Sequence, residues 1–359
     1  MSEIKKIGIL TSGGDCSGLN VAISAVVKAA TLKNWTVYGI HNGTEGLTER
    51  PLSYEILTPQ NFSETPWAKT AGSYLGSLNK GVKPELMDEV ARRFGEGVRE
   101  LGLDAVIVLG GDGSMNVLQR YCSQAGIKMI GIPKTIDNDT PLTDISIGFE
   151  TACQVCMDSI DSIETTARSH HRAMIVEMMG RDAGHLALQS AVAGGADVCL
   201  IPEIPYTLDG IIKKLEAVKA SGRTYALIVV SEGIKTENGE MLSLGKNMIG
   251  EKVHGGIGDY LANLLNEKYN GFQIRCTRLG HVQRSGHPVY GDRMLATLFG
   301  AKAVDLLSNG QTNVMVGLDH GRVDCYPLKD VVSAGSKRVD VHGVYVQAAK
   351  LLGMYIGEI

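Results

Sequence analysis

The chain has 359 residues, a formal net charge of −4 and 44% hydrophobic residues, enough to build two α/β domains with separate cores. Its lysines and arginines are scattered, so no basic face for nucleic acid is expected. No apolar run approaches the roughly 20 residues that span a bilayer, and no signal segment precedes the first expected strand. We therefore expect a cytoplasmic protein that does not bind membranes.

Apolar strands alternate with segments of helical periodicity along the chain. This alternation predicts an α/β fold with mainly parallel sheets wrapped by helices. The expected strands are Lys6 to Leu10, Thr36 to Ile40, Ala105 to Leu109, Met129 to Ile132, Ala173 to Val176, Val198 to Ile201 and Ala226 to Val230. Expected helices include Glu85 to Leu101 and Leu208 to Ala220, whereas Thr44 to Thr70 is expected to be rich in loops.

The first strand runs into a glycine turn that contains Gly13 and Gly14, and a helix start follows at Gly18. Backbone N–H groups at such a turn can cradle a phosphate. The spacing differs from both the dinucleotide fingerprint Gly-x-Gly-x-x-Gly and the Walker P-loop. A dehydrogenase is therefore disfavoured.

A second glycine turn, Gly110 to Ser114, follows the strand that ends at Leu109. Its glycines, Gly113 among them, allow close approach of phosphate, and Asp112 can hold a magnesium ion. The same signature occurs in proteins that resemble NAD kinases and diacylglycerol kinases. Alone it predicts a phosphate-donor site, with Ser114 beside it, and leaves the acceptor open.

The run from Pro133 to Asp139 supplies a cation, a hydroxyl and two carboxylates in seven residues: Lys134, Thr135, Asp137 and Asp139. Phosphoryl transfer needs positive charge on the migrating group, fixed hydrogen bonds and a carboxylate near the attacking hydroxyl. By itself the run could equally form a plain turn. The neighbouring glycine turns favour the catalytic interpretation.

Further polar residues follow later strands, and arginine suits phosphate while carboxylates suit sugar hydroxyls. We expect them near the carboxyl ends of the strands, where doubly wound sheets bind ligands. They are Arg172, the run Glu177 to Arg181, Glu232, Arg275, and the run Leu279 to Arg284.

Taken in order, these groups resemble the 6-phosphofructokinase family from Lys6 to about Leu307. The resemblance implies two similar three-layer α/β/α domains with the active site in the cleft between them. Residues 1–148 with about 283–333 would bind the nucleotide, and residues 149–282 with about 334–359 would bind fructose 6-phosphate.

The resemblance also implies transfer from ATP to the 1-hydroxyl of fructose 6-phosphate, with Mg²⁺ at Asp112. Asp137 matches the catalytic base, Thr135 and Asp139 its neighbours, and Arg181 the residue that stabilises the migrating phosphoryl group. The expected ATP-binding residues are Gly13, Gly14, Lys80, Gly113, Ser114 and Lys134. The expected sugar-phosphate ligands are Thr135, Asp137, Met179, Gly180, Arg181, Glu232, His281 and Arg284, with Arg172 and Arg275 reaching in from a neighbour. Shared sites imply a homo-oligomer, usually a tetramer.

Two positions bear on the choice of phosphate donor. Family members that use pyrophosphate tend to carry Asp at the position of Gly113 and Lys at that of Lys134, whereas the best-known bacterial ATP enzymes have Gly at both. Gly113 leaves space for the α-phosphate of ATP, and Lys134 adds a cation. We expect ATP, and keep a pyrophosphate-dependent enzyme and a catalytically silent sugar-phosphate sensor as alternatives.

Other positions depart from the familiar bacterial pattern. Asn79 replaces an arginine that bridges phosphates, a charge that Lys80 or Lys134 can supply. The cations of the bacterial effector site for ADP and phosphoenolpyruvate are altered, so we expect changed or absent control by these anions. The matching positions are Ser24, Lys28, Glu164, Ser221 and Arg223.

Three further features are not expected to take part in catalysis. The seven cysteines are expected to be free thiols, with Cys153 and Cys156 structural rather than zinc ligands. The basic stretch Gly335 to Arg338 is expected to be a solvated loop, although it could meet a phosphate. The segment after about Gly310 matches the family least.

Overall fold

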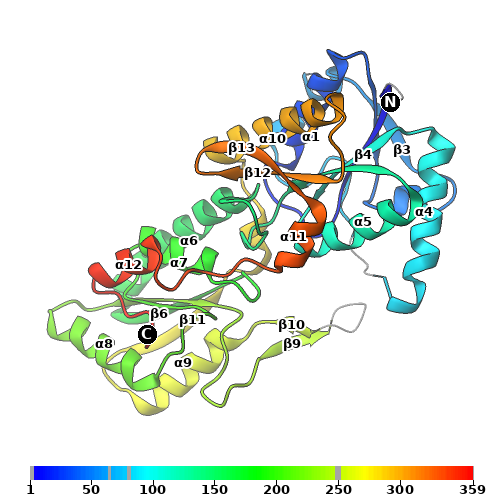
Figure 1. Ribbon diagram of the computed structural model, residues 1–359. Helices are drawn as coiled ribbons and strands as arrows, with labels where there is room; N and C mark the ends of the chain where they lie inside the picture. Colours follow the sequence, from blue (N-terminus) through cyan, green and yellow to red (C-terminus); the bar gives the residue numbers. More distant parts are fainter. Residues whose placement is uncertain (1–3, 64–65, 79–81, 247–251, 359) are drawn as a thin grey trace. The chain divides into compact units, whose positions relative to one another are not determined.

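The computed structural model describes residues 4–63, 66–78, 82–246 and 252–358. These residues form two compact units, each built from two separate stretches of chain (Figure 1). Unit 1 comprises Met1–Thr151 and Arg284–Lys337, and unit 2 comprises Ala152–Gln283 and Arg338–Ile359. Within the ranges described, no helix has the length and apolar character needed to cross a bilayer.

Unit 1 is built on a seven-stranded sheet in the order β13-β12-β5-β4-β1-β2-β3. The strands from β12 to β2 run parallel, and β13 and β3 pair antiparallel at the two edges. The strands are β1 (Lys6–Thr11), β2 (Thr36–Ile40), β3 (Tyr54–Leu57), β4 (Ala105–Gly110), β5 (Lys128–Pro133), β12 (Val314–Asp319) and β13 (Arg322–Pro327).

Helices cover both faces of this sheet. Every residue of the central strand β4 is buried, as a parallel strand between two helix layers requires. On one face Val106 and Val108 contact a core that includes Phe94 and Tyr121. Helices α1 and α10 contact each other, and α10 also contacts β5 and β12. The helices are α1 (Leu19–Thr31), α2 (Glu45–Thr48), α3 (Gln60–Ser63), η1 (Pro66–Lys69), η2 (Pro84–Leu86), α4 (Met87–Leu101), α5 (Asp112–Ala125), α10 (Tyr290–Ser308) and α11 (Leu328–Ala334).

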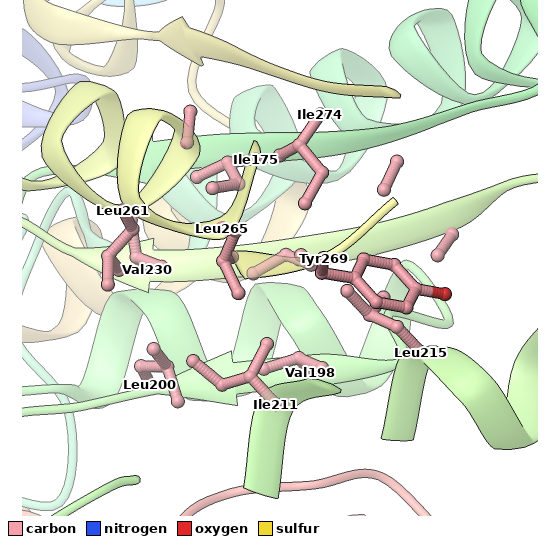
Figure 2. Close-up of a cluster of buried hydrophobic side chains, with 14 of the residues drawn as sticks. Ile175, Val198, Leu200, Ile211, Leu215, Val230, Leu261, Leu265, Tyr269 and Ile274 are labelled. Atoms are coloured by element: carbon pink, nitrogen blue, oxygen red, sulfur yellow. The ribbon is translucent and has the colours of Figure 1, made fainter. Parts of the chain in front are cut away.

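Unit 2 contains a four-stranded parallel sheet in the order β11-β6-β8-β7 and a two-stranded antiparallel ribbon, β9 and β10. Figure 2 shows the core on one face, where Ile175, Val198 and Val230 from the strands meet Ile211 of helix α8 (Leu208–Ala220) and Leu261 of helix α9 (Ile257–Lys268). Helix α8 begins at the cap Thr207, whose hydroxyl accepts a hydrogen bond from the Gly210 N–H.

The strands of unit 2 are β6 (Arg172–Met178), β7 (Val198–Leu200), β8 (Ala226–Ser231), β9 (Ser243–Lys246), β10 (Lys252–His254) and β11 (Gln273–Arg278). The helices are α7 (His185–Ala193), α8 (Leu208–Ala220), α9 (Ile257–Lys268) and α12 (Val344–Leu351), and η3 (Gly280–Arg284) ends on the first residue of the second stretch of unit 1. Helix α6 (Phe149–His170) begins at the end of the first stretch of unit 1 and continues into unit 2.

The predicted α/β fold with mainly parallel sheets is confirmed, and all seven predicted strands exist within two residues of their expected ends. The expectation of a loop-rich stretch from Thr44 to Thr70 left out the short elements within it. That stretch contains α2, α3, η1 and the edge strand β3, whose pattern of exposed and half-buried residues hides it from a search for apolar strands. The two sheets also differ in size, with seven and four strands.

Candidate active site

In unit 1 the glycine turn after β1 lies beside the end of β5. The Lys134 Nζ donates a hydrogen bond to the carbonyl oxygen of Gly14. A Cβ at Gly13 would lie 3.0 Å from the Ser114 Oγ and 3.2 Å from the Lys134 Nζ, and its φ of 85° also favours glycine. Four residues predicted to bind the donor, Gly13, Gly14, Ser114 and Lys134, therefore lie together.

Lys134 is almost fully buried, with 2% of its surface exposed. Burial lowers the pKa of its ammonium to about 8, the Arg284 guanidinium adds to the shift, and the carboxylates of Asp15 and Asp137 oppose it. Lys134 is thus a buried cation whose surroundings compensate its charge only in part. An anionic ligand such as a phosphate would supply the missing compensation.

Asp112 opens α5, and its carboxylate interacts with that of Asp139. Burial, and then the like charge of Asp139, raises the pKa of Asp112. Two hard carboxylate ligands whose charges repel each other fit a magnesium ion, which usually takes one or two carboxylates plus phosphate oxygens and water. The part of the chain that the structure describes contains no group of three or more potential metal ligands.

Gly113 follows Asp112 in the first turn of α5. A Cβ built at Gly113 meets nothing within 4 Å. The position therefore faces open space, and a larger side chain there would enter this space without disturbing the helix.

The run from Lys134 to Asp139 forms a braced turn. The hydroxyl of Thr135 accepts a hydrogen bond of 3.1 Å from the Asp137 N–H. Asn138, at a φ of 50°, accepts from the Ser146 N–H at 3.0 Å and donates to the Asp144 carbonyl at 3.2 Å. Only 5% of Asp137 is exposed. The run is thus a turn, and this turn holds Asp137 and Thr135 in fixed positions.

Arg284, predicted to bind the sugar phosphate, lies against the glycine turn of unit 1. Its Nη1 donates to the Asp15 carbonyl at 2.9 Å, and a Cβ at Gly14 would lie 2.7 Å from the same nitrogen. A side chain at position 14 would therefore have to displace the Arg284 guanidinium. His281 lies three residues earlier on η3.

Lys337 was expected to lie in a solvated loop, but its side chain is packed against the backbone near Asp139. Its Nζ donates to the carbonyl oxygens of Thr143 at 2.8 Å and Asp144 at 3.0 Å, and its backbone N–H donates to that of Asp139 at 2.6 Å. Burial lowers the pKa of Lys337 to about 8, against the carboxylates of Asp144 and Asp139. The expectation of a solvated loop is wrong here, because Lys337 braces the backbone next to Asp139.

In unit 2 four predicted residues meet at the carboxyl ends of β6 and β8. The Glu232 N–H donates to the Met178 carbonyl at 2.8 Å, and the Arg181 N–H donates to the Glu232 Oε1 at 3.2 Å. Gly180 has a φ of 142°, and a Cβ there would lie 2.7 Å from the Ala183 carbonyl oxygen. Glycine is required at this position, next to Met179 and Arg181.

Gln283 is a positioning residue that the sequence analysis quoted without a role. Its buried Oε1 accepts a hydrogen bond of 3.1 Å from the Met179 N–H, and its Nε2 donates to the Gly280 carbonyl at 2.8 Å. It therefore ties the Met179 backbone to η3. Glu177 has an anchoring role instead, because its carboxylate accepts from the Gly256 and Gly258 N–H groups at the start of α9.

Arg172 and Arg275 lie elsewhere on the sheet. Arg172 is the first residue of β6, six residues or about 20 Å from Met178 at the other end, and its Nε donates to the Gln273 side chain. Arg275 lies in β11 opposite Met174. The expectation that these arginines lie at the carboxyl ends of strands is wrong for Arg172, which begins β6. Arg275 lies in the middle of β11.

The remaining expectations concern Lys80 and Asn79, the cysteines and the effector positions. Lys80 and Asn79 lie outside the described residues. Cys156 is buried and burial raises its pKa to about 12, in agreement with a structural role, and none of the seven cysteines is in a disulfide. At the altered effector positions, Glu164 accepts hydrogen bonds from Arg168 and Tyr225. Arg223 forms an ion pair with Asp197, and Ser24 is buried in α1. Ser221 caps the end of α8.

Comparisons with known proteins agree with this description of the fold. The fold matches that of Pichia pastoris phosphofructokinase in the T-state with a TM-score of 0.79, at 28% identity and over 93% of this chain, which spans only 36% of the yeast chain. It also matches a pyrophosphate-dependent phosphofructokinase from Nitrosospira multiformis, with a TM-score of 0.77 at 22% identity over 94% of this chain and 86% of that one. The latter likeness shows the fold alone.

Sequence comparison is more specific. The family model described as Phosphofructokinase matches residues 6–307. An ATP-dependent 6-phosphofructokinase 1 of a Nostoc species is 43% identical over the full length of both chains. An ATP-dependent 6-phosphofructokinase of Chloroflexus aggregans is 40% identical over 99% of each. The chain belongs to the phosphofructokinase family, as the resemblance predicted.

Proposed function

We propose that this protein transfers the γ-phosphoryl group of ATP to the 1-hydroxyl of fructose 6-phosphate, giving fructose 1,6-bisphosphate and ADP, as an enzyme of glycolysis in the cytoplasm. The observation that carries the proposal is the open space at Gly113, which lies between Asp112 and Ser114 in the turn that meets Gly13 and the Lys134 ammonium. The names of full-length relatives such as the Nostoc ATP-dependent enzyme support the same donor.

The donor site in this proposal consists of Gly13, Gly14, Gly113, Ser114 and Lys134. The glycines let backbone N–H groups approach phosphate, and the buried Lys134 offers an incompletely compensated charge. Asp112, with Asp139 beside it, would hold Mg²⁺, which when bound supplies positive charge against the phosphate oxygens. Pyrophosphate remains the rival donor because a lysine occupies position 134.

The chemistry in this proposal rests on Asp137. Its carboxylate would accept the proton of the 1-hydroxyl as that oxygen attacks the phosphorus, and burial protects the transfer from bulk water. Thr135 would position the reacting group, while Lys134 and Arg181 would stabilise the charge on the migrating phosphoryl group.

Fructose 6-phosphate would be held by Met179, Gly180, Glu232, His281 and Arg284 of one subunit. Arg172 and Arg275 lie away from the carboxyl ends of β6 and β8, which supports a role in the site of a neighbouring subunit. We therefore propose a homo-oligomer, with a tetramer as the expected form.

The proposal is tested by initial rates of fructose 1,6-bisphosphate formation with magnesium and either ATP or pyrophosphate. We expect turnover with ATP and at most a trace with pyrophosphate. Turnover with pyrophosphate but not with ATP would show that pyrophosphate is the phosphate donor. Binding of fructose 6-phosphate without turnover on either donor would instead identify a silent sensor.

A further inference from the structure

The backbone of Arg181 has a conformation that an arginine rarely adopts. Its φ is 50°, in the left-handed region, and Gly180 before it has a φ of 142°. Both residues lie in the loop between β6 and α7. A residue in such a conformation keeps it only where its surroundings hold it. The contacts of this loop therefore help to decide where the Arg181 side chain lies.

The end of β8 holds the Arg181 backbone on both sides. The Glu232 Oε1 accepts a hydrogen bond of 3.2 Å from the Arg181 N–H. A Cβ built at Gly233 would overlap with the Arg181 carbonyl oxygen, so only glycine at position 233 leaves room for that carbonyl group.

The far end of the loop is held by Glu203, which follows β7. The Gly184 N–H donates to both carboxylate oxygens of Glu203, at 3.0 Å and 3.1 Å. A Cβ at Gly184 would lie 2.7 Å from the Glu203 Oε2, so the absence of a side chain there allows the carboxylate to approach. Within the loop, the Ala183 N–H donates to the Gly180 carbonyl oxygen at 3.0 Å. A fixed Gly184 therefore limits the movement of the whole loop.

Glu203 is itself held by a distant part of the chain. Its Oε1 also accepts a hydrogen bond of 3.0 Å from the N–H of Val339, 136 residues away. Val339 is buried and belongs to the second stretch of unit 2. Hydrogen bonds from backbone N–H groups to a carboxylate are strong, and two separate donors fix its orientation. Glu203 thus joins the loop to the carboxyl-terminal stretch.

We propose that Glu203 is a positioning residue for phosphoryl transfer, because it holds the loop from Met179 to Gly184 and thereby keeps the Arg181 guanidinium in place. This role rests on the function proposed above for Arg181. Without the carboxylate, the Arg181 backbone can relax toward an ordinary φ, and the guanidinium moves with it. A displaced charge stabilises the transition state less well, so the chemical step slows.

The test uses two substitutions of Glu203 and one control. Glu203→Ala removes the acceptor, whereas Glu203→Gln keeps a carbonyl oxygen that can take the place of Oε1 and accept from both N–H groups. Glu216→Ala removes an exposed glutamate of α8. Hydrogen exchange, measured by mass spectrometry on the peptide from Met178 to Leu186, reports the opening of the loop without reference to activity. Exchange in the rest of the chain reports that each variant is folded.

In Glu203→Ala we expect exchange in this peptide to become at least tenfold faster. Its kcat should fall at least tenfold, while the KM for ATP stays within twofold of wild type. Glu203→Gln and Glu216→Ala should remain within threefold of wild type in both exchange and kcat. When Arg181 is already replaced by alanine, Glu203→Ala should lower the residual kcat less than twofold, because Glu203 acts through Arg181.

Unchanged exchange in Glu203→Ala would overturn the proposal. So would a fall in kcat that is as large without the Arg181 side chain as with it, since a general structural defect acts in both backgrounds. Absence of turnover in the wild type with either donor would instead reject the proposed function. The exchange measurement would then still decide whether Glu203 holds the loop.

Discussion

The ammonium of Lys134 and the carbonyl oxygen of Gly14 are joined by a hydrogen bond that links the end of β5 to the glycine turn after β1. The two residues are 120 positions apart in the sequence. Each was predicted on its own to bind the donor, and the contact places the two predicted residues side by side. The lysine fixes the turn and at the same time carries charge into it.

The buried position of Lys134 predicts an unusual pH dependence of stability. Between about pH 8 and its ordinary pKa of 10.5, the lysine is protonated in the unfolded chain and neutral in the folded one. The free energy of unfolding of the wild type, measured relative to Lys134→Met, should therefore rise across this window, by on the order of 3 kcal/mol. Below pH 8 the difference should stay constant.

Urea unfolding at several pH values measures this difference. The variant Lys219→Met, which changes an exposed lysine, serves as the control and should run parallel to the wild type. A difference between wild type and Lys134→Met that is flat from pH 8 to 10.5 would contradict the assigned burial.

Gly113→Asp should remove activity with ATP. The new carboxylate enters open space, so the fold should survive, while its negative charge opposes the phosphate chain of the donor. We expect kcat/KM for ATP to fall about 100-fold or more, a loss of about 2.7 kcal/mol in transition-state stabilisation. Gly113→Ala is the matched control, and it should keep most of the ATP activity. Unchanged kinetics in Gly113→Asp would remove Gly113 from the donor site.

Asp137→Ser should reduce kcat by roughly 10² to 10⁴-fold, the usual contribution of a general base, with little change in the KM for fructose 6-phosphate. The serine hydroxyl can still occupy the space near Thr135, so the turn braced by Asn138 should persist. Steady-state kinetics and direct binding of fructose 6-phosphate provide the two measurements. Near-wild-type kcat would show that another group takes the proton.

Gln283→Leu should raise the KM for fructose 6-phosphate several-fold and leave the KM for ATP unchanged. The substitution keeps the side-chain volume but removes the acceptor of the Met179 N–H, so the backbone at Met179 loses a fixed partner. Gln283→Glu, which retains an acceptor at the same place, should recover part of the affinity. If both variants raise the KM for ATP equally, Gln283 acts on general stability and not on the sugar site.

The sequence was sufficient to predict the parts of the fold that local pattern determines. The buried run Val106 to Leu109 and the helix Leu208 to Ala220 have clear periodicity and lie where expected. Strand β3 was missed because an edge strand with one exposed face and polar residues lacks an apolar run. Strand β12 was also missed, and its buried run is short, from Met315 to Gly317, with half-buried and exposed residues at the ends.

Part of the candidate site was likewise predictable from local sequence, and part of it was not. The glycine turns and the run from Lys134 to Asp139 can be recognised in the sequence by their composition. The positions of Lys337 next to Asp139 and of Gln283 against Met179 depend on tertiary contacts of 198 and 104 residues in sequence separation. Neither residue type nor local spacing signals such contacts. Arg172 shows the opposite error, because a strand that begins one residue earlier than expected places it at the amino end of β6.

The pairing of β12 with β5 has a consequence for biosynthesis. Until Val314 has been translated, β5 lacks its neighbour, and one edge of the sheet in the growing chain is open. At ordinary translation speeds the ribosome needs roughly 10 to 40 seconds to reach that point after completing β5. During this time the nascent protein presents unpaired backbone groups along an apolar strand, which makes it a natural client for chaperones.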